Sequence, residues 1–369
     1  MLQDIGEGFA IGAGLFWRAA WALALGYAVS ALIQVFVSRG EAAKHMGRAG
    51  VRPVGLAMAL GFASSSCSFA ALSATRSLYA KGADLIAALA FMFASTNLAI
   101  EVAALAVVFL GWPFAVALFL GAPILVAVMA ILVRLTRPRR LAEEARERAG
   151  DTIGHEMQPG KDLPEGVADR VRAKQAWAQV GRSYIGEWRM VWKELLVGFT
   201  VAGLVTAMVP QAFFQALFPT GLATWLLVPL HALLAPVLAI FTVIGSMGNG
   251  PLAAVLWANG VAFGAIMAFL YSDFIVPPSL KINARYYGWR FAFYLGSIFA
   301  VSAVIAGIIV HGLFAVTGFI PDEARDVKQL SRFAVDYTFF LNVFALAVSI
   351  ALIALARRSS SEHADSTEA

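Results

Sequence analysis

The stretch Lys81-Gly-Ala-Asp-Leu-Ile-Ala-Ala-Leu-Ala-Phe91 recurs as Asn259-Gly-Val-Ala-Phe-Gly-Ala-Ile-Met-Ala-Phe269, with the glycine, the last phenylalanine and the apolar spacing in step. A second pair follows in both places, and it consists of Gly111-Trp-Pro-Phe-Ala-Val-Ala-Leu118 and Gly288-Trp-Arg-Phe-Ala-Phe-Tyr-Leu295. Upstream lies a third pair, Trp17-Arg-x-x-Trp21 and Trp188-Arg-x-x-Trp192. Three pairs in the same order at a nearly constant offset indicate that the chain is internally duplicated.

The composition places this duplication in a membrane. Of the 369 residues, 60% are hydrophobic and only 14% are charged, whereas a soluble domain carries about 25% charged residues. Several apolar stretches exceed the roughly 18 residues that mark a spanning helix. The net charge of +5 would suggest nucleic acid in a soluble chain, but here basic residues gather in loops beside apolar segments, as cytoplasmic loops do. We therefore expect an all-α polytopic membrane protein that binds no nucleic acid.

Apolar stretches of two kinds occur along the chain. The clear spans are expected at 14–37, 84–110, 112–135, 191–218, 260–280, 291–317 and 336–356. Two further stretches, 51–80 and 222–258, are broken by Gly, Ser, Pro and Asn and read as helical hairpins. Two arms of about 14 residues would each rise roughly 20 Å, which is short of the roughly 30 Å hydrocarbon core. The first hairpin is therefore expected to enter and leave on one side, while the arms of the longer second hairpin could cross fully.

Basic residues predict the orientation. They concentrate in loops 38–52, 76–81 and 281–290, in the central stretch, and at Arg357-Arg358. If each hairpin returns to the side it entered from, every basic loop is cytoplasmic, the N-terminus is outside and the C-terminus is cytoplasmic. Each copy then has three spans and a broken helical hairpin, so the second copy is inverted. The expected fold is two inverted-topology repeats plus an extra C-terminal span, in a bacterial-type cytoplasmic (inner) membrane.

This interpretation divides the chain into five parts. They are a first membrane repeat (1–135), a cytoplasmic charged linker (136–190), a second membrane repeat (191–318), an extracytoplasmic loop with a C-terminal transmembrane helix (319–356), and a disordered tail (357–369). A duplicated, apolar chain of this kind is typical of secondary transporters, whose substrate site lies between the repeats.

The two hairpin tips are the first candidates for the transport path, because broken backbone at membrane depth survives only when it is buried in protein or lines a cavity. The first tip holds Ser64, Ser65, Ser66, Cys67 and Ser68, and the second holds Ser246, Asn249 and Pro251. In the second tip, the asparagine is expected to cap a new helix and the proline to suit its first turn. A helix N-terminus exposed at mid-membrane attracts anions. The alternative is that the serines only allow close packing and the second tip is only a connector.

Polar residues also interrupt the helix after each hairpin. The first copy has Asn97 and then Glu101, and the second has Asp273 before Pro277-Pro278. In the duplicated register, Ser95 corresponds to Asp273. A charged side chain at membrane depth costs about 2.5–3.5 kcal/mol on insertion scales, so it usually faces the protein interior and has a function. Glu101 and Asp273 are therefore the candidates for ion coupling, and the alternative is a hydrogen-bonded carboxyl that only supports packing.

Several stretches resemble a known family. They include Cys67-Ser-Phe-Ala70, Ser77-Leu-Tyr-Ala-Lys-Gly82 and Gly250-Pro-Leu252. The chain resembles the predicted permease family that includes ArsP-type organoarsenical efflux permeases, over roughly 15–135 and 190–318. That family has a Cys-Ser-Cys-Gly motif, then Pro, then Ser-Leu-x-x-Lys-Gly. Here the second cysteine position holds Phe69, so the resemblance implies transport but not a dithiol grip on trivalent arsenic.

The leading hypothesis is a secondary permease that exports a small solute, such as an organoarsenical, metal-linked or other thiol-reactive species, driven by an ion gradient or the membrane potential. The expected partners are the small-molecule substrate and membrane lipid, and a homodimer is left open. No cofactor is expected, and a lone Cys67 excludes a cysteine-only metal site. Two alternatives are a membrane-embedded enzyme with Cys67 as nucleophile, which would need a nearby base, and a non-transporting scaffold subunit that tethers a soluble partner.

Overall fold

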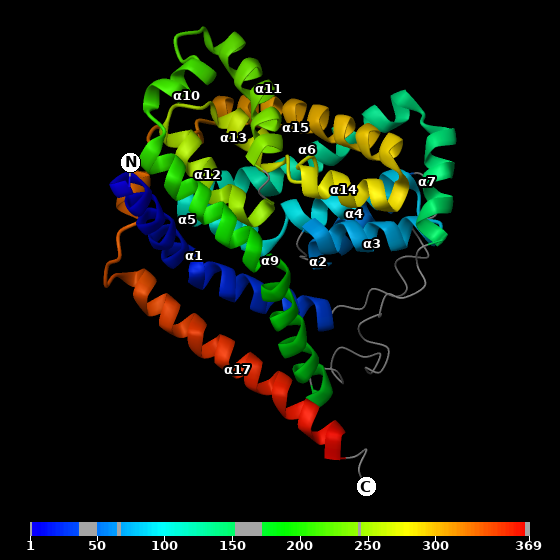
Figure 1. Ribbon diagram of the computed structural model, residues 1–369. Coiled ribbons are helices and arrows are strands. Elements are labelled where there is room, and N and C mark those ends of the chain that lie inside the picture. The colour runs from blue at the N-terminus through cyan, green and yellow to red at the C-terminus, as the bar shows by residue number, and fades with distance from the viewer. Residues whose placement is uncertain (1, 37–49, 65–67, 152–171, 243–244, 366–369) are drawn as a thin grey trace.

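The computed structural model describes residues 2–36, 50–64, 68–151, 172–242 and 245–365. Within these ranges every regular element is a helix, and there is no strand (Figure 1). The first seven helices are α1 (Leu2–Phe36), α2 (Val51–Ser64), α3 (Ser68–Ala80), α4 (Leu85–Asn97), α5 (Ile100–Phe109), α6 (Trp112–Thr136) and α7 (Arg139–Asp151). The others are α9 (Lys174–Met208), α10 (Gln211–Leu217), α11 (Thr224–Thr242), α12 (Ser246–Ala258), α13 (Phe263–Leu270), α14 (Pro277–Tyr287), α15 (Trp289–Thr317), α16 (Val327–Leu330) and α17 (Tyr337–Asp365).

Six of the described helices are long and apolar enough to cross a membrane, namely α1, α6, α9, α11, α15 and α17. A seventh span arises if α4 and α5, which are bent by 43°, count as one. The expectation of a polytopic all-helical protein is thus confirmed. Two of the expected spans are not single unbroken helices, because 84–110 is this bent pair and the first helix of 260–280 ends at Leu270. Proline explains the second break, since Pro277-Pro278 lack N–H donors and hold Val276 in an extended conformation.

Each of the two stretches expected to be broken is divided into two helices. α2 ends at Ser64 and α3 begins at Ser68, while α11 ends at Thr242 and α12 begins at Ser246. With 14 and 13 residues, α2 and α3 rise only about 20 Å each. The start of the second membrane stretch differs from the prediction, because α9 runs unbroken from Lys174 through position 191. The helix of the apolar segment therefore continues back into the polar segment before position 191, where the linker was expected to end.

The glycines shared by the repeated stretches make the same turns. Gly82 and Gly260 have φ of 99° and 83°, and Gly111 and Gly288 have φ of 110° and 87°. A Cβ atom disfavours these positive φ values, so glycine is the residue that fits there. The second pair also caps corresponding helices, since Gly111 precedes α6 and Gly288 precedes α15.

Helices α1 and α9 form the most extensive helix contact, and they cross at small residues. A Cβ on Gly203 of α9 would lie 2.2 Å from the carbonyl oxygen of Gly8 and 2.5 Å from the amide nitrogen of Gly12, both on α1. Near the other end of α1, Phe36 packs edge-on against Trp177 of α9, with ring centroids 5.5 Å apart. Residues early in α1 therefore meet residues late in α9, so the two helices are antiparallel. Glycine at the crossing permits the close backbone approach typical of membrane helices.

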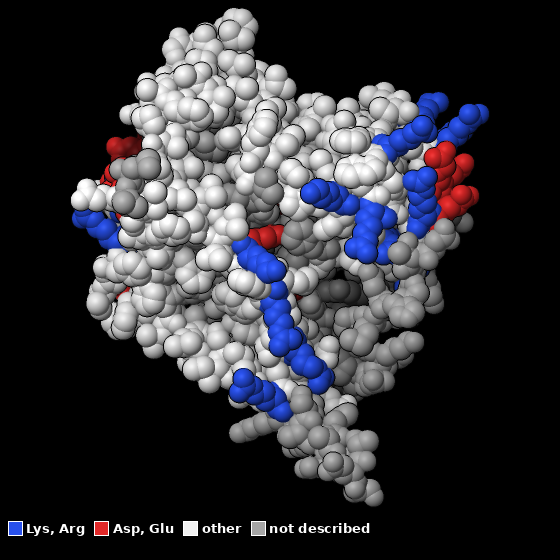
Figure 2. All heavy atoms as spheres, in the orientation of Figure 1, with Lys and Arg blue, Asp and Glu red and all other residues white. Residues whose placement is uncertain are grey.

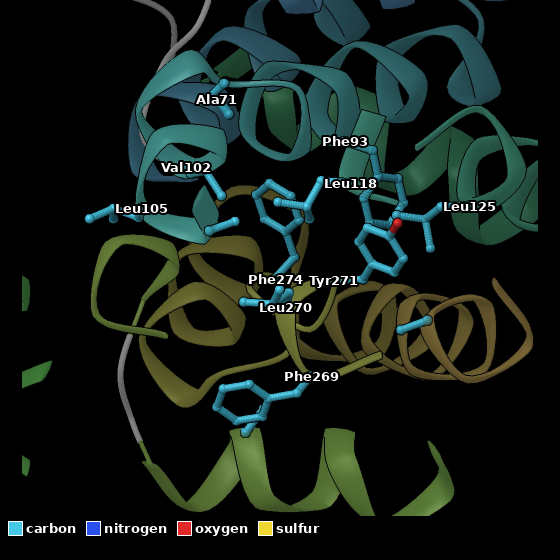
Figure 3. Close-up of a cluster of buried hydrophobic side chains, with 14 of the residues drawn as sticks. Ala71, Phe93, Val102, Leu105, Leu118, Leu125, Phe269, Leu270, Tyr271 and Phe274 are labelled. Atoms are coloured by element: carbon cyan, nitrogen blue, oxygen red, sulfur yellow. The ribbon is translucent and has the colours of Figure 1, made fainter. Parts of the chain in front are cut away.

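Helices α6 and α15 form a second antiparallel pair. At one end Trp112 packs against Phe319, just after α15, and at the other end the Thr136 hydroxyl lies 2.7 Å from the Tyr294 hydroxyl. Between α13 and α14, the buried Tyr271 hydroxyl donates a hydrogen bond of 3.0 Å to the Ala117 carbonyl of α6. Figure 3 shows Tyr271 and Phe274 directed toward Phe93 and Leu118, so side chains from both parts of the chain share one core.

Charged side chains are unevenly distributed over the surface. Lys and Arg gather over α7 and α14 and along α9 (Figure 2). α7 is the polar helix that follows α6, and it packs on the end of α3, where the Tyr79 hydroxyl donates to the Ala142 carbonyl at 2.6 Å. Arg76 of α3 also reaches α7, with its Nε donating to the Ala149 carbonyl at 3.3 Å. α7 therefore covers the end of the first hairpin that lies away from its tip.

Candidate functional site

The two hairpins meet where each begins its second helix. Ser68 and Ser246 are the first residues of α3 and α12, and their hydroxyl oxygens lie 3.0 Å apart. Both residues are buried, at 2% and 4% exposure. The first N–H groups of a helix have no partner inside the helix, and the N-terminus carries partial positive charge. Two half-length helices thus bring their N-termini together deep in the fold.

Of the other first-tip candidates, Ser64 ends α2 and is fully buried. Ser65, Ser66 and Cys67 lie outside the described residues, and their role in the path stays a prediction.

The second tip is joined to the carboxyl predicted for ion coupling. The Asn249 amide nitrogen donates a hydrogen bond of 3.0 Å to a carboxylate oxygen of Asp273, and both residues are buried. Asp273 lies in the non-helical segment between α13 and α14. The Ser279 hydroxyl of α14 donates to the Asp273 carbonyl at 3.2 Å and so supports this segment. The structure therefore brings together two of the predicted site residues that lie 24 residues apart.

The expected capping pattern at this tip is wrong in detail. The cap of α12 is Gly245, and Asn249 stands in the first turns, with its side chain directed to Asp273 instead of the helix end. Pro251 is inside α12 and not in its first turn. Because proline has no N–H, it leaves the carbonyl four residues earlier without its helical hydrogen bond. The N-terminal part of α12 therefore has one backbone carbonyl that lacks its helical hydrogen bond.

The remaining predicted polar residues lie in other contacts. Glu101 is in the first turn of α5, fully buried, and it packs against α1, where a Cβ on Gly26 would lie 2.7 Å from the Glu101 Cβ. The Asn97 amide nitrogen donates to the Phe93 carbonyl of its own helix at 3.2 Å and so supports the end of α4. The two candidate carboxyls, Glu101 and Asp273, thus occupy different helix contacts.

Sequence reasoning missed Glu194 on α9. Its carboxylate lies against Gly245, the cap of α12, since a Cβ there would be 2.5 and 2.7 Å from the two carboxylate oxygens. A carboxylate beside a helix N-terminus is electrostatically favourable. A signal was available, because Glu194 is a charged residue inside an expected span, although no helix break in the sequence marks its position.

The site thus combines two hydroxyls, an amide, two carboxyls and the N-termini of two helices, all within an apolar fold. Such a set can hold a small polar or charged solute or exchange a proton. In the part of the chain that the structure describes, no group of three His, Cys, Asp or Glu residues is placed to hold a metal ion.

Comparisons with known proteins agree on one class. A family model described as "Predicted permease" matches residues 4–312. A protein of Mycobacterium tuberculosis (strain H37Rv) named "Putative permease Rv2963" is 36% identical over 308 residues, which cover 82% of this chain and 76% of that protein. No solved structure matches the chain.

Proposed function

Because the chain belongs to the ArsP family of predicted permeases, we propose that it is a secondary permease that exports a small solute across the cytoplasmic membrane. The observation that carries this proposal is the contact between Ser68 and Ser246. Discontinuous helices whose N-termini meet at mid-membrane form the substrate sites of many secondary transporters. The site residues are then Ser68, Ser246, Asn249 and Pro251, with Ser64 to Cys67 of the first tip and Asn97 beside them.

The proposal includes an inverted repeat. If a two-fold axis in the membrane plane relates two copies, a helix that touches its own counterpart must run antiparallel to it. The pairs α1 with α9 and α6 with α15 each join matching repeat stretches, and each pair is antiparallel. The hairpin tips also meet residue for residue, because Ser68 and Ser246 occupy the same place in the duplicated register. Both features support the repeat and a substrate site on its axis.

Asp273 is the carboxyl best placed to couple transport to an ion gradient. It is hydrogen-bonded to Asn249, which lies three residues along α12 from Ser246. A change in the protonation or ion occupancy of Asp273 would therefore alter a contact made by the second tip. Burying a carboxylate in a membrane protein is costly, which favours a functional reason for keeping it. Glu101 is the second candidate, although it acts from the contact between α1 and α5.

The proposed substrate is an organoarsenical, a metal-linked species or another thiol-reactive solute. A lone cysteine, Cys67, lies in the serine-rich first tip, and Phe69 stands where the family has its second cysteine. A single thiolate can bind such a species reversibly but cannot chelate it with a partner thiol. We place transport ahead of enzymatic use of Cys67, because the family is one of permeases and the two tips meet symmetrically.

The test is uptake into everted membrane vesicles of a panel of arsenicals, metal ions and thiol compounds, with and without an imposed ion gradient. Vesicles with wild-type protein should take up at least one member in a gradient-dependent way, and empty-vector vesicles should not. Ser246→Ala should lower the rate, and Cys67→Ser should abolish uptake of thiophilic members only. Uptake no greater than that of empty vesicles across the panel would refute the proposed function.

A further inference from the structure

A second buried polar region lies between α3 and α14, well separated from the tip along both helices. We call it the α3–α14 seam and define it by Thr75 and Tyr79 on α3 and Asn283 and Tyr287 on α14. All four residues are at most 5% exposed. Thr75 is two helical turns from Ser68 on the same face of α3, a rise of about 10 Å. On α14, Ser279 stands one turn before Asn283 and bonds to Asp273, so the seam extends toward the site from both helices.

The four seam residues line a small internal cavity. Its volume is about 10 Å³, and the rest of its wall comes from apolar side chains of α4 and α15, among them Leu89 and Leu295. A polar cavity of roughly this size is just large enough for one water molecule. The cavity is therefore a place where one small hydrogen-bonding group fits between the two copies of the duplicated chain.

Two of the four seam residues, Thr75 and Asn283, have polar side-chain groups with no partner in the described fold. Neither the amide nitrogen nor the amide oxygen of Asn283 is hydrogen-bonded, and neither is the Thr75 hydroxyl. An unsatisfied buried polar group destabilises the fold, and the hydrocarbon region of a membrane supplies no water to satisfy it. The Thr75 hydroxyl and the Asn283 amide can therefore form hydrogen bonds with a molecule that enters the cavity. Because the set is uncharged and offers both donors and acceptors, it suits water or a neutral hydroxyl or oxo group.

Aromatic rings close the seam at the end that lies away from the tip. The rings of Tyr79 and Tyr287 meet edge-on with centroids 6.2 Å apart. The Arg146 guanidinium of α7 lies 4.5 Å from the centre of the Tyr79 ring, and that of Arg76 lies 4.6 Å from the centre of the Tyr286 ring. These tyrosine rings and their cation–π contacts block the α7 end of the seam, and the tyrosine hydroxyls give the blocked end polar groups.

The corresponding contact on the other side of the tips is apolar. By the duplicated register, α12 against α5 matches α3 against α14. There, Gly250 lies against Leu105 and Phe109, at 3.5 and 3.6 Å from a Cβ built on the glycine. A polar seam is thus present on the α3 side, whereas the matching contact of α5 and α12 is apolar where Gly250 meets Leu105 and Phe109. This difference is what a transporter that faces one side of the membrane would show.

We propose that the α3–α14 seam is the half of the transport route between the α7 end of the protein and the Ser68–Ser246 contact. Thr75 and Asn283 form a station that holds water, or a neutral polar group of the solute, on its way to the tip. Tyr79 and Tyr287 close the route at the α7 end. The inference rests on the proposed transport function and adds a second binding position to it.

The first test compares uptake with thermal stability for the full-length protein. Thr75→Val and Asn283→Leu keep the side-chain volume roughly constant and remove the unsatisfied groups, so each should lower uptake at least tenfold while the melting temperature stays unchanged or rises. Thr75→Ser, which keeps the hydroxyl, should transport normally. So should Thr206→Val on α9, whose hydroxyl only bonds its own helix at Ala202. Wild-type uptake by both seam variants, or a lowered melting temperature in both, would overturn the proposal.

A second test does not depend on knowing the solute. In a Cys67→Ser background, Thr75→Cys should react with a small water-soluble thiol reagent added to everted vesicles, because a water-filled route reaches it. Ser302→Cys is the matched control, since Ser302 is fully buried on α15 and bonds only its own helix. An unreactive Thr75→Cys, or equal reaction at both positions, would refute the seam. If the wild type transports nothing in the panel, the proposed function fails while this labelling still decides the seam.

Discussion

Replacing Asp273 is the sharpest perturbation that the structure offers. Asp273→Asn keeps the shape of the side chain and leaves an amide oxygen to accept the 3.0 Å bond from Asn249, but the amide cannot release a proton or bind a cation as a carboxylate does. We expect this variant to fold, to bind substrate and to exchange it across the membrane at equilibrium. Net uptake driven by an imposed gradient should be lost, because no charge remains to follow the gradient.

The size of the stability change follows from the same contact. A hydrogen bond to a charged acceptor contributes about 1.5–3 kcal/mol and a neutral one about 1 kcal/mol. The weaker bond in Asp273→Asn is offset because a charge no longer has to be buried, so unfolding free energy should change by about 1 kcal/mol or less. Asp273→Leu instead leaves the Asn249 nitrogen without its partner, beside an amide oxygen that already has none. This second variant should lose about 1–3 kcal/mol.

The assay is solute uptake into proteoliposomes with an imposed ion gradient, measured beside solute exchange and thermal unfolding of the same preparations. Glu101→Gln serves as the matched variant, because it removes the other buried candidate carboxyl. If the two carboxyls share the coupling, it should behave as Asp273→Asn does, and if Asp273 acts alone it should be silent. Wild-type gradient-driven uptake by Asp273→Asn would refute the reasoning and make this carboxyl structural.

Three further predictions concern packing, orientation and pH. Gly203→Ala should destabilise the protein by about 1–3 kcal/mol, because its Cβ would meet the backbone of Gly8 and Gly12, whereas Gly186→Ala on the same helix has open space and should not, as thermal unfolding would show. In a Cys67→Ser background, cysteines at Thr220 and Glu323 should react with an impermeant thiol reagent on intact cells and one at Glu147 should not; labelling at Glu147 would contradict the inverted topology. Burial alone would raise the pKa of Asp336, but hydrogen bonds from Arg18 and Thr338 outweigh it and hold that pKa below its usual value. The stability from this group is therefore present above its unfolded pKa and lost as pH falls through the lower folded pKa. Asp336→Asn should lower the melting temperature slightly near neutral pH, by an amount worth at most about 1 kcal/mol for a partly exposed pair. The difference from wild type should vanish in acid.

The amino-acid sequence by itself determined the features that depend on short-range signals. Apolar length predicted the membrane class, and the clusters of Gly, Ser, Pro and Asn predicted both hairpins within a few residues of where α2–α3 and α11–α12 break. The duplicated glycines were recognisable because positive φ leaves little choice of residue, as at Gly111 and Gly288. The sequence did not predict the start of α9. The apolar composition placed the start of the spanning helix at 191, whereas the charged segment before it is part of the same helix from Lys174.

Only the tertiary structure decided which polar groups meet. Ser68 and Ser246 are 178 residues apart, Asn249 turns away from the helix end it was expected to cap, and Glu194 reaches Gly245 from another helix. Helical periodicity tells which residues share a face, but it carries no information on which face of a distant helix lies opposite. Which polar groups meet depends on how the two copies pack, and that packing is set by the glycine crossing of α1 with α9 and by the shared aromatic core. For that reason the candidate site and the α3–α14 seam, both formed between the copies, became visible only in the folded chain.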